Sequence, residues 1–376
     1  MPVLFGIGMP QIFNSPGMKT KILPIILLVV SCAPKGNSDS LALKDYDPVS
    51  VFILEEHHPA QAKFPVIDAH THPYPKDEAG IREWVKVMEA NNVEVSCINT
   101  YSCGDEFERL AKLYTSVSDK FVMCCGFDMS EWGKPGFQEK ALADLERCHN
   151  LGAKGVGELG DKGFGEAYCL RAATGKATPT GHLNDPAFAP LLDKCGEYGM
   201  PVNIHLGDPI WMYEPMDAHN DGYMNAEHWK IDLSQPGILN LDELVATLEE
   251  CCDKHPNTTF IAAHFLNYSH DYAFLGAVLD RHPNLYLDNA ARHQETCVTP
   301  RATRAFYEKY QDRIVFGTDN TPLDGMYKDV WRILETEDEH FYLREQSYHW
   351  PMQGIGLPDE VLRKVYHDNA KKLFDI

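Results

Sequence analysis

Short runs of apolar residues alternate with amphipathic stretches from Val66 to the end of the 376-residue chain. The runs read as near-continuous apolar segments, which is typical of parallel strands buried on both faces. Eight of them are expected to form strands, at 66–70, 93–99, 121–127, 155–159, 202–206, 260–265, 285–289 and 314–318. A further apolar run at 51–54 is expected to form a short lead-in strand.

The stretches between these runs carry apolar residues with the spacing i, i+3, i+4, i+7 of one helix face. Ile81, Trp84, Val85 and Met88 follow this rule, as do residues of 107–114, 241–248 and 272–279. Eight strands that each lead into a helical segment predict an α/β fold, a (β/α)8 TIM barrel formed as a single domain by residues 49–376. The alternative is a doubly wound open sheet, which usually has a glycine-rich phosphate loop after its first strand.

Composition and charge say little about the fold, but they exclude some classes of binding partner. Hydrophobic residues make up 44% of the chain and charged residues 24%, as in ordinary globular proteins. With 34 basic and 55 acidic side chains, the formal net charge is −21. This charge argues against nucleic acid or an anionic membrane surface as a partner, because phosphates require excess Lys and Arg. We therefore expect a small-molecule substrate, while the sequence leaves open whether the chain forms a homo-oligomer.

The eleven cysteines do not form a C-x-x-C pair. Two adjacent pairs, Cys124-Cys125 and Cys251-Cys252, lie inside a predicted strand and a predicted helix. Neighbouring side chains in a strand point to opposite faces, so these cysteines are expected to be small buried hydrophobes. A disulfide framework and a zinc–thiolate site are both disfavoured.

The first 32 residues are expected to be a targeting segment. A basic start at Met18 is followed by the apolar run 22–30, which is too short to span a bilayer, and by Val-Val-Ser-Cys ending at Cys32. That ending resembles a bacterial lipobox, which makes Cys32 the acylated amino terminus and 1–17 an upstream extension; a cleaved signal without lipid is the alternative. Residues 33–48 are expected to form a flexible tether. The predicted location is the bacterial cell envelope, after secretion across the inner membrane, with membrane contact only through a lipid anchor.

The first predicted strand ends in the sequence Val-Ile-Asp-Ala-His-Thr-His-Pro, at 66–73. Side chains alternate along a strand, so Asp68, His70 and His72 share one face. Two imidazoles two residues apart can hold one metal ion; alone, they could equally lie on a solvated edge.

Further candidate ligands follow the other predicted strands. Because the carboxyl ends of barrel strands converge on one face, we expect these side chains to meet. They are Glu158 on the fourth strand, His205 on the fifth, His264 on the sixth, Asp288 on the seventh with Arg292 nearby, and Asp319 after the eighth. Four histidines and an aspartate at strand ends favour a metal site over separate structural roles.

Together these motifs resemble those of the amidohydrolase superfamily, in its amidohydrolase-2 branch, from about Phe64 to the carboxyl terminus. The resemblance rests on the motif at 66–73 and on Ile-His-Leu, Ala-Ala-His-Phe and Phe-Gly-Thr-Asp, in the family's order. It implies that His70, His72 and Asp319 bind metal, with His205 as a fourth ligand in mononuclear members. It also implies that His264 binds a second metal or polarises the substrate, and that Asp319 is the general base.

The fourth strand departs from the family pattern. Many binuclear members carry a carboxylated lysine at its end, whereas this strand has Glu158, and Lys154 belongs near the opposite rim. Glu158 is expected either to bridge two ions or to hold a histidine, so the number of metals stays open. Histidine and carboxylate ligands favour Zn²⁺, as one or two ions, with Mn²⁺ as the second choice.

Three long segments, 160–185, 207–240 and 320–357, follow strands and are expected to surround the same face. The candidate substrate contacts are Arg292, Asp288, Trp211 and His182. Arg292 suits a substrate carboxylate, and a salt bridge with Asp288 is its alternative role.

The predicted activity is metal-dependent hydrolysis of an amide, ester or lactone bond in a small molecule. One alternative is metal-dependent, non-oxidative decarboxylation of an unsaturated or aromatic acid. A second is a lipoprotein that binds a ligand without turnover.

Overall fold

The computed structural model describes residues 41–165, 181–343 and 348–376. It divides the chain into two units, Met1–Ala42 and Leu43–Ile376, and the second unit contains the whole barrel. The predicted signal segment, Cys32 and the first half of the tether, 33–40, lie outside the described residues. Among the described residues, no helix combines the length and apolar composition that a membrane span requires.

Eight parallel strands pair in the order of the sequence, as predicted. They are β1 (Val66–Thr71), β2 (Val93–Asn99), β3 (Phe121–Cys125), β4 (Gly155–Asp161), β5 (Val202–Leu206), β6 (Phe260–Ala262), β7 (Leu285–Asp288) and β8 (Ile314–Val315). The Ala69 amide donates to the Phe316 carbonyl at 2.8 Å and the Asp319 amide to the His70 carbonyl at 2.8 Å, which links the ends of the sheet. The TIM-barrel prediction is confirmed.

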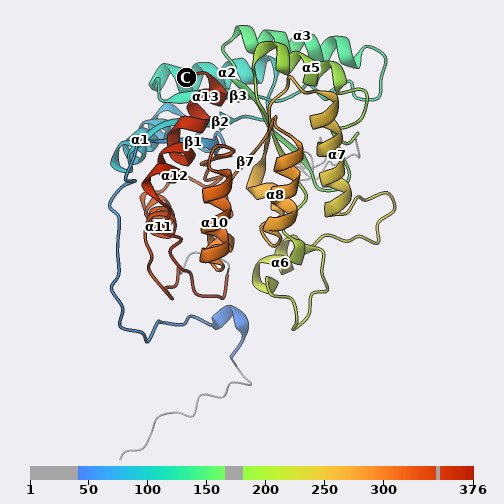
Figure 1. Ribbon diagram of the computed structural model, residues 1–376. Helices are drawn as coiled ribbons and strands as arrows, with labels where there is room; N and C mark the ends of the chain where they lie inside the picture. Colours follow the sequence, from blue (N-terminus) through green and yellow to red (C-terminus); the bar gives the residue numbers. More distant parts are fainter. Residues whose placement is uncertain (1–40, 166–180, 344–347) are drawn as a thin grey trace, which may run out of the picture. The chain divides into compact units, whose positions relative to one another are not determined.

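Helices cover the outside of this barrel (Figure 1). They are α1 (Glu78–Ala90), α2 (Gly104–Val117), α3 (Phe137–Asn150), α5 (Ala189–Tyr198), α6 (Tyr223–Trp229), α7 (Leu241–Lys254), α8 (Tyr272–Arg281), α9 (His293–Thr296), α10 (Pro300–Tyr310), α11 (Asp324–Glu335), α12 (Asp359–Arg363) and α13 (Asn369–Phe374). The predicted apolar faces point inward: Ile81, Trp84 and Met88 of α1 are all buried. This burial is what stabilises each helix against the sheet.

Several details of the predicted strands are wrong. The third and eighth strands, expected to continue to 127 and 318, end at Cys125 and Val315. Residues 51–54 form no strand, and their side chains are exposed. The sixth strand was expected to continue to 265 but ends at Ala262. His264, Phe265 and Leu266 follow with φ of 61°, 53° and 54°, values that no strand can adopt. The chain therefore turns sharply after β6 and carries His264 out of the strand direction.

An apolar cluster closes the barrel at the amino-terminal end of the strands. Ile67, Cys97, Cys124 and Ile261 point into the interior there and pack with Phe374 of α13. Lys154 lies at this end, as predicted. Its ammonium donates to the Asp375 carbonyl at 3.1 Å. The described cysteines are all free, and all except the half-buried Cys103 are buried, as expected of small hydrophobes. The candidate metal ligands lie at the opposite end of the barrel.

A capping box begins α7 after the long segment that follows β5. The Asn240 side chain accepts from the Glu243 amide, and the Glu243 carboxylate accepts from the Asn240 amide, both at 2.9 Å. We expect Asn240→Ala to lower the free energy of unfolding by about 1 kcal/mol, because the Glu243 amide loses its side-chain acceptor at the helix start. Urea unfolding would measure the change, and a variant as stable as the wild type would contradict it.

Candidate metal centre

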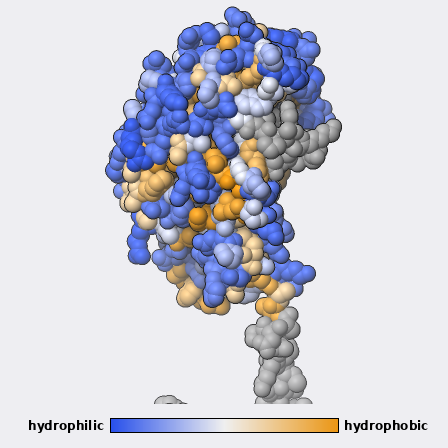
Figure 2. Space-filling model, turned by 90° about the vertical axis from the view of Figure 1, so that its right-hand side faces the viewer, coloured by the Kyte–Doolittle hydropathy of each residue, from blue (hydrophilic) through white to orange (hydrophobic). Residues whose placement is uncertain are grey.

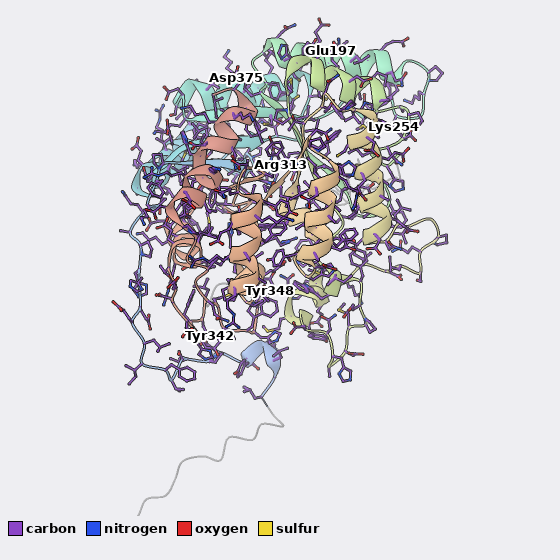
Figure 3. The ribbon with its side chains drawn as sticks, in the orientation of Figure 1. Glu197, Lys254, Arg313, Tyr342, Tyr348 and Asp375 are labelled. Carbon is purple, nitrogen blue, oxygen red and sulfur yellow. The ribbon has the colours of Figure 1, made fainter. Side chains whose placement is uncertain are left out.

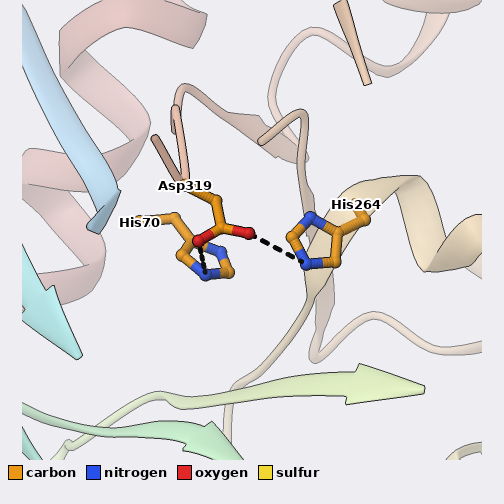
Figure 4. A group of neighbouring side chains, drawn as sticks. All are labelled: His70, His264 and Asp319. Carbon is orange, nitrogen blue, oxygen red and sulfur yellow. Dashed lines mark ion pairs between the residues drawn. The ribbon is translucent and has the colours of Figure 1, made fainter. Parts of the chain in front are cut away.

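Side chains from separate strand ends meet at the carboxyl end of the barrel. Three groups at this end offer donor atoms that lie within 4.8 Å of one another: His70, His264 and Asp319; His70, His72 and Glu158; and Glu158, His205 and His264. The candidate ligands of the sequence analysis therefore form one centre. Figure 4 shows Asp319 between His70 and His264.

Glu158 is shared by two of these groups. Its Oε1 lies 3.0 Å from His205 Nδ1, 3.2 Å from His264 Nε2 and 3.5 Å from His70 Nε2. Its Oε2 lies 3.5 Å from His72 Nε2 and accepts from the Tyr101 hydroxyl at 2.8 Å. One carboxylate therefore faces four imidazoles, which is the arrangement expected of a bridging ligand.

Asp319 is the more accessible carboxylate of the centre. Its Oδ1 lies 3.0 Å from His72 Nε2 and 4.0 Å from His70 Nε2, and its Oδ2 lies 3.8 Å from His264 Nε2. Its side chain is 26% exposed, whereas that of Glu158 is 5% exposed. Asp319 can therefore contact both the centre and a molecule in the adjoining cavity.

In each histidine, the rear ring nitrogen, which faces away from the centre, lies next to a hydrogen-bond acceptor that has no proton to donate. The rear nitrogen must therefore carry the hydrogen, and a neutral ring presents a lone pair to the centre. The pairs are His70 Nδ1 with Asp288 Oδ2 at 2.8 Å, His72 Nδ1 with the Asn99 carbonyl at 2.9 Å, His264 Nδ1 with the Ala290 carbonyl at 2.8 Å, and His205 Nε2 with the Gly207 carbonyl at 2.9 Å. His205 thus presents Nδ1, and the other three present Nε2.

Asp288 lies beneath the centre instead of in the cavity. It is fully buried, and its Oδ2 accepts from His70 Nδ1 and from the Asn203 amide at 2.9 Å. Its Oδ1 accepts from the backbone amides of His264 at 2.8 Å and Ala290 at 3.1 Å. Its predicted contact with substrate is therefore wrong, because both oxygens are occupied and no surface is exposed.

Arg292 does not pair with Asp288, which corrects the alternative role considered above. Its guanidinium donates to Asn267 Oδ1 from Nε at 3.0 Å and to the Ala291 carbonyl at 2.8 Å. Its Nε also lies 3.4 Å from Glu295 Oε2. Held in this way, Arg292 lines the cavity beside the centre.

The acidic and basic side chains of the centre shift one another's pKa values. Burial would lower the pKa of His72, but hydrogen bonds with Asp319 and Glu158 outweigh it and raise the pKa to about 9. Burial would raise the pKa of Asp319, but the hydrogen bond with His72 and the charge of His70 hold it well below its usual range. Burial alone would also raise the pKa of Glu158, yet the charge of His70 holds it far below the ordinary carboxyl value. The carboxylates thus stay ionised and attract positive charge.

These residues fit a divalent cation. His70 Nε2 is a buried atom without a hydrogen-bond partner among the described residues, and it points at Glu158 and Asp319. A ring nitrogen left in this state is unfavourable unless it gains a ligand. Imidazole nitrogens and carboxylate oxygens are also the donors that zinc and related ions prefer.

A cavity of about 240 Å³ adjoins the centre. His205, His264 and Asp319 form its inner wall, and the other walls include Lys162, Asp208, Trp229, Arg292, Glu295 and Tyr348. Two predicted contacts do not line it. Trp211 packs against Gly222 and Trp350, and His182 donates to Asp161 Oδ2 at 2.7 Å. Their contact with substrate therefore stays a prediction.

The sequence analysis missed several residues around the centre. Tyr101 donates to Glu158 and stacks on His72 with ring centroids 4.7 Å apart. Lys162 Nζ lies 2.8 Å from both Asp208 oxygens, and the Tyr348 hydroxyl donates to Glu295 at 2.6 Å. Tyr101 follows the end of β2 and could have been found by reading every strand end. The others lie in or next to long segments without periodicity.

Comparisons with known proteins give the family of the chain. Solved structures with a similar fold include a Staphylococcus aureus protein described as an amidohydrolase (14% identity, TM-score 0.50, covering 83% of this chain and 100% of that one). Others are a 2,6-dihydroxybenzoate decarboxylase (15%, 0.49, 83% and 100%) and 4-oxalomesaconate hydratase from Rhodopseudomonas palustris (13%, 0.49, 82% and 95%). No curated protein sequence matches the chain. The family model of the amidohydrolases, Amidohydro_2, matches residues 67–376. The chain therefore belongs to the amidohydrolase family.

Proposed function

We propose that the protein is a metal-dependent hydrolase that cleaves an amide, ester or lactone bond of a small molecule. The observation that supports this most is the pairing of a buried, shared carboxylate, Glu158, with a partly exposed one, Asp319, around four imidazoles. The buried carboxylate of Glu158 suits metal binding, and the partly exposed carboxylate of Asp319 suits proton transfer at the edge of a cavity.

His70, His72 and Glu158 would hold one ion, and His205, His264 and the same Glu158 a second, with Asp319 completing the set. Zn²⁺ is the first choice and Mn²⁺ the second, since both accept histidine and carboxylate ligands. Such an ion, when bound, lowers the pKa of water from ~15.7 toward ~7 and so supplies hydroxide at neutral pH.

The chain's own residues provide the rest of the reaction. Asp319, ionised and exposed to the cavity, accepts the proton of the attacking water and returns it to the leaving group. Tyr101, which donates to Glu158 Oε2 at 2.8 Å, keeps that carboxylate in place. The guanidinium of Arg292 donates to Asn267 and Ala291 and also lines the cavity. Its remaining N–H groups would bind a carboxylate of the substrate.

A metal-removal experiment tests this proposal. Chelation is expected to abolish hydrolysis, and Zn²⁺ is expected to restore it with about two equivalents per chain, because Glu158 is shared by two ligand groups. Metal analysis and a panel of esters, lactones and amides provide the readouts. Rebinding should also raise the midpoint of thermal unfolding, since the ions bind only the folded state. Full activity of the metal-free protein would contradict the proposal.

Decarboxylation is the second candidate. It is favoured by the two cationic side chains of the cavity, Arg292 and Lys162, which suit a carboxylate-bearing substrate. Carbon dioxide release from unsaturated and aromatic acids, measured beside base consumption on the hydrolase panel, separates the two reactions. A metal-loaded protein inert on every panel would favour ligand binding without turnover and would end both proposals.

A further inference from the structure

Exposed hydrophobic side chains are concentrated in one segment before the barrel, Leu43–Leu54, called here the arm. The described part of the chain has twelve large hydrophobic residues that are exposed, and seven of them lie in the arm. Val51 is 85% exposed and Ile53 is 101% exposed. Exposed apolar residues concentrated in one region of a folded domain often mark an interaction site.

The arm lies at the same end of the barrel as the candidate metal centre. The Phe52 ring contacts that of His340 edge-on at 4.9 Å, and the next residue, Phe341, pairs with Met352. Met352 in turn contacts Cys297, directly after α9, at the carboxyl end of β7. Figure 3 shows Tyr342 and Tyr348 at this end, opposite Glu197 and Asp375. The view in Figure 2 likewise has hydrophobic residues at the lower end of the molecule.

A residue of the cavity wall and one four positions later in the chain are two more exposed apolar residues. Trp229 lines the cavity and is 60% exposed, and Leu233 is 44% exposed. Lys162 Nζ lies 5.4 Å from the Trp229 ring centroid, so the indole has a charged group beside an apolar face. Tryptophan next to basic residues is typical of surfaces that meet the interface of a lipid bilayer.

We propose that the arm and Trp229 rest on a lipid surface, so that the cavity mouth faces the membrane. The inference goes beyond the proposed reaction and does not depend on it. The predicted acylated Cys32 lies eleven residues before Leu43, so the chain between them spans at most about 40 Å. An anchor at that position would keep the arm close to the bilayer, and the arm would fix the orientation.

Charge favours lipid over a second copy of the chain as the occupant of this surface. Each copy has a formal net charge of −21, and acidic residues lie within the arm at Asp45 and Asp47 and directly after it at Glu55 and Glu56. Two such surfaces would repel each other, whereas a neutral lipid surface would not. We therefore expect binding to zwitterionic phosphatidylcholine and weaker binding to anionic lipid.

Fluorescence quenching by lipid tests the orientation. The full-length protein isolated from membranes is mixed with phosphatidylcholine vesicles that carry a doxyl quencher near the headgroup. We expect Trp229→Phe to remove roughly half or more of the quenching, because an interfacial side chain lies within 5–10 Å of the headgroup boundary. The double variant Val51→Glu, Ile53→Glu is expected to reduce quenching to a similar extent, because two charges oppose contact of the arm with lipid.

Leu151→Glu is the matched control. Leu151 is also an exposed leucine, at 40%, but it follows α3 and so lies at the other end of the barrel. Quenching should be unchanged in this variant, and hydrolysis of a soluble substrate should be unchanged in it and in the arm variant. The proposal fails if the wild type does not associate with vesicles or if Trp229→Phe keeps full quenching. It also fails if sedimentation shows a dimer that the arm variant dissociates, because a second copy would then cover the arm.

Discussion

Asp319→Asn is expected to lower kcat/KM by about 10³-fold, because a general base typically contributes 10²–10⁴ to the rate. Asparagine keeps the shape of the side chain but cannot accept a proton. It also tolerates the left-handed backbone at this position, where φ is 49°, and its backbone amide still donates a hydrogen bond to the His70 carbonyl. Kinetics on the best substrate of the panel would measure the loss.

Two controls keep this result specific. The free energy of unfolding of Asp319→Asn should match that of the wild type, and its metal content should be measured, because Asp319 is also a candidate ligand. Asp324→Asn changes an exposed carboxylate five residues away that pairs with Lys328, and it should leave kcat/KM unchanged. Retention of more than about a tenth of the activity in Asp319→Asn would remove Asp319 from the role of base.

His70→Ala should abolish turnover for a different reason, since it removes a ligand shared by two of the three donor groups. The two variants should differ in metal content. His70→Ala should lose bound metal together with activity, whereas Asp319→Asn should lose activity and keep most of its metal. Equal metal loss in both would show that Asp319 acts mainly as a ligand.

The barrel and the side chains that meet at its carboxyl end could be predicted because both follow from strand periodicity. Buried parallel strands leave an apolar signal in the sequence, and their carboxyl ends converge whatever the loops do. His70, His205 and Glu158 were therefore found by reading where each apolar run stops. His264 was found by the same argument, although the turn after β6 that presents it was not.

Residues placed by long segments could not be predicted in this way. Trp211 and His182 were expected in the cavity, but the segments that carry them turn their side chains toward Trp350 and Asp161. The pairs that do line the cavity, such as Glu295 with Tyr348, join residues 53 positions apart. Such contacts depend on the tertiary path of loops, which leaves no periodic signal.

Asp288 was identified from the sequence as a substrate contact. In the structure its side chain is buried beneath the histidines, where it accepts from His70, and does not reach the cavity. Its burial beneath His70 indicates a positioning role. Removing it should therefore damage metal binding and stability together, without any contact between Asp288 and substrate.

Asp288→Ala is expected to lower the free energy of unfolding by about 3–5 kcal/mol, since it leaves buried donors of His70, Asn203, His264 and Ala290 without an acceptor. Urea unfolding of the metal-free protein would measure this loss. Metal affinity should also fall by about 10–100-fold, because the His70 ring loses the acceptor that fixes its tautomer.

Asp288→Asn separates these two effects. Its remaining oxygen can still accept from the amides of His264 and Ala290, so most of the stability should return. Its amide group would face the donor at His70 Nδ1, so metal affinity should stay low. Asp280→Asn, at an exposed carboxylate paired with Lys309, should change neither quantity. Metal binding by Asp288→Asn with wild-type affinity would show that the ring of His70 is held by its packing alone.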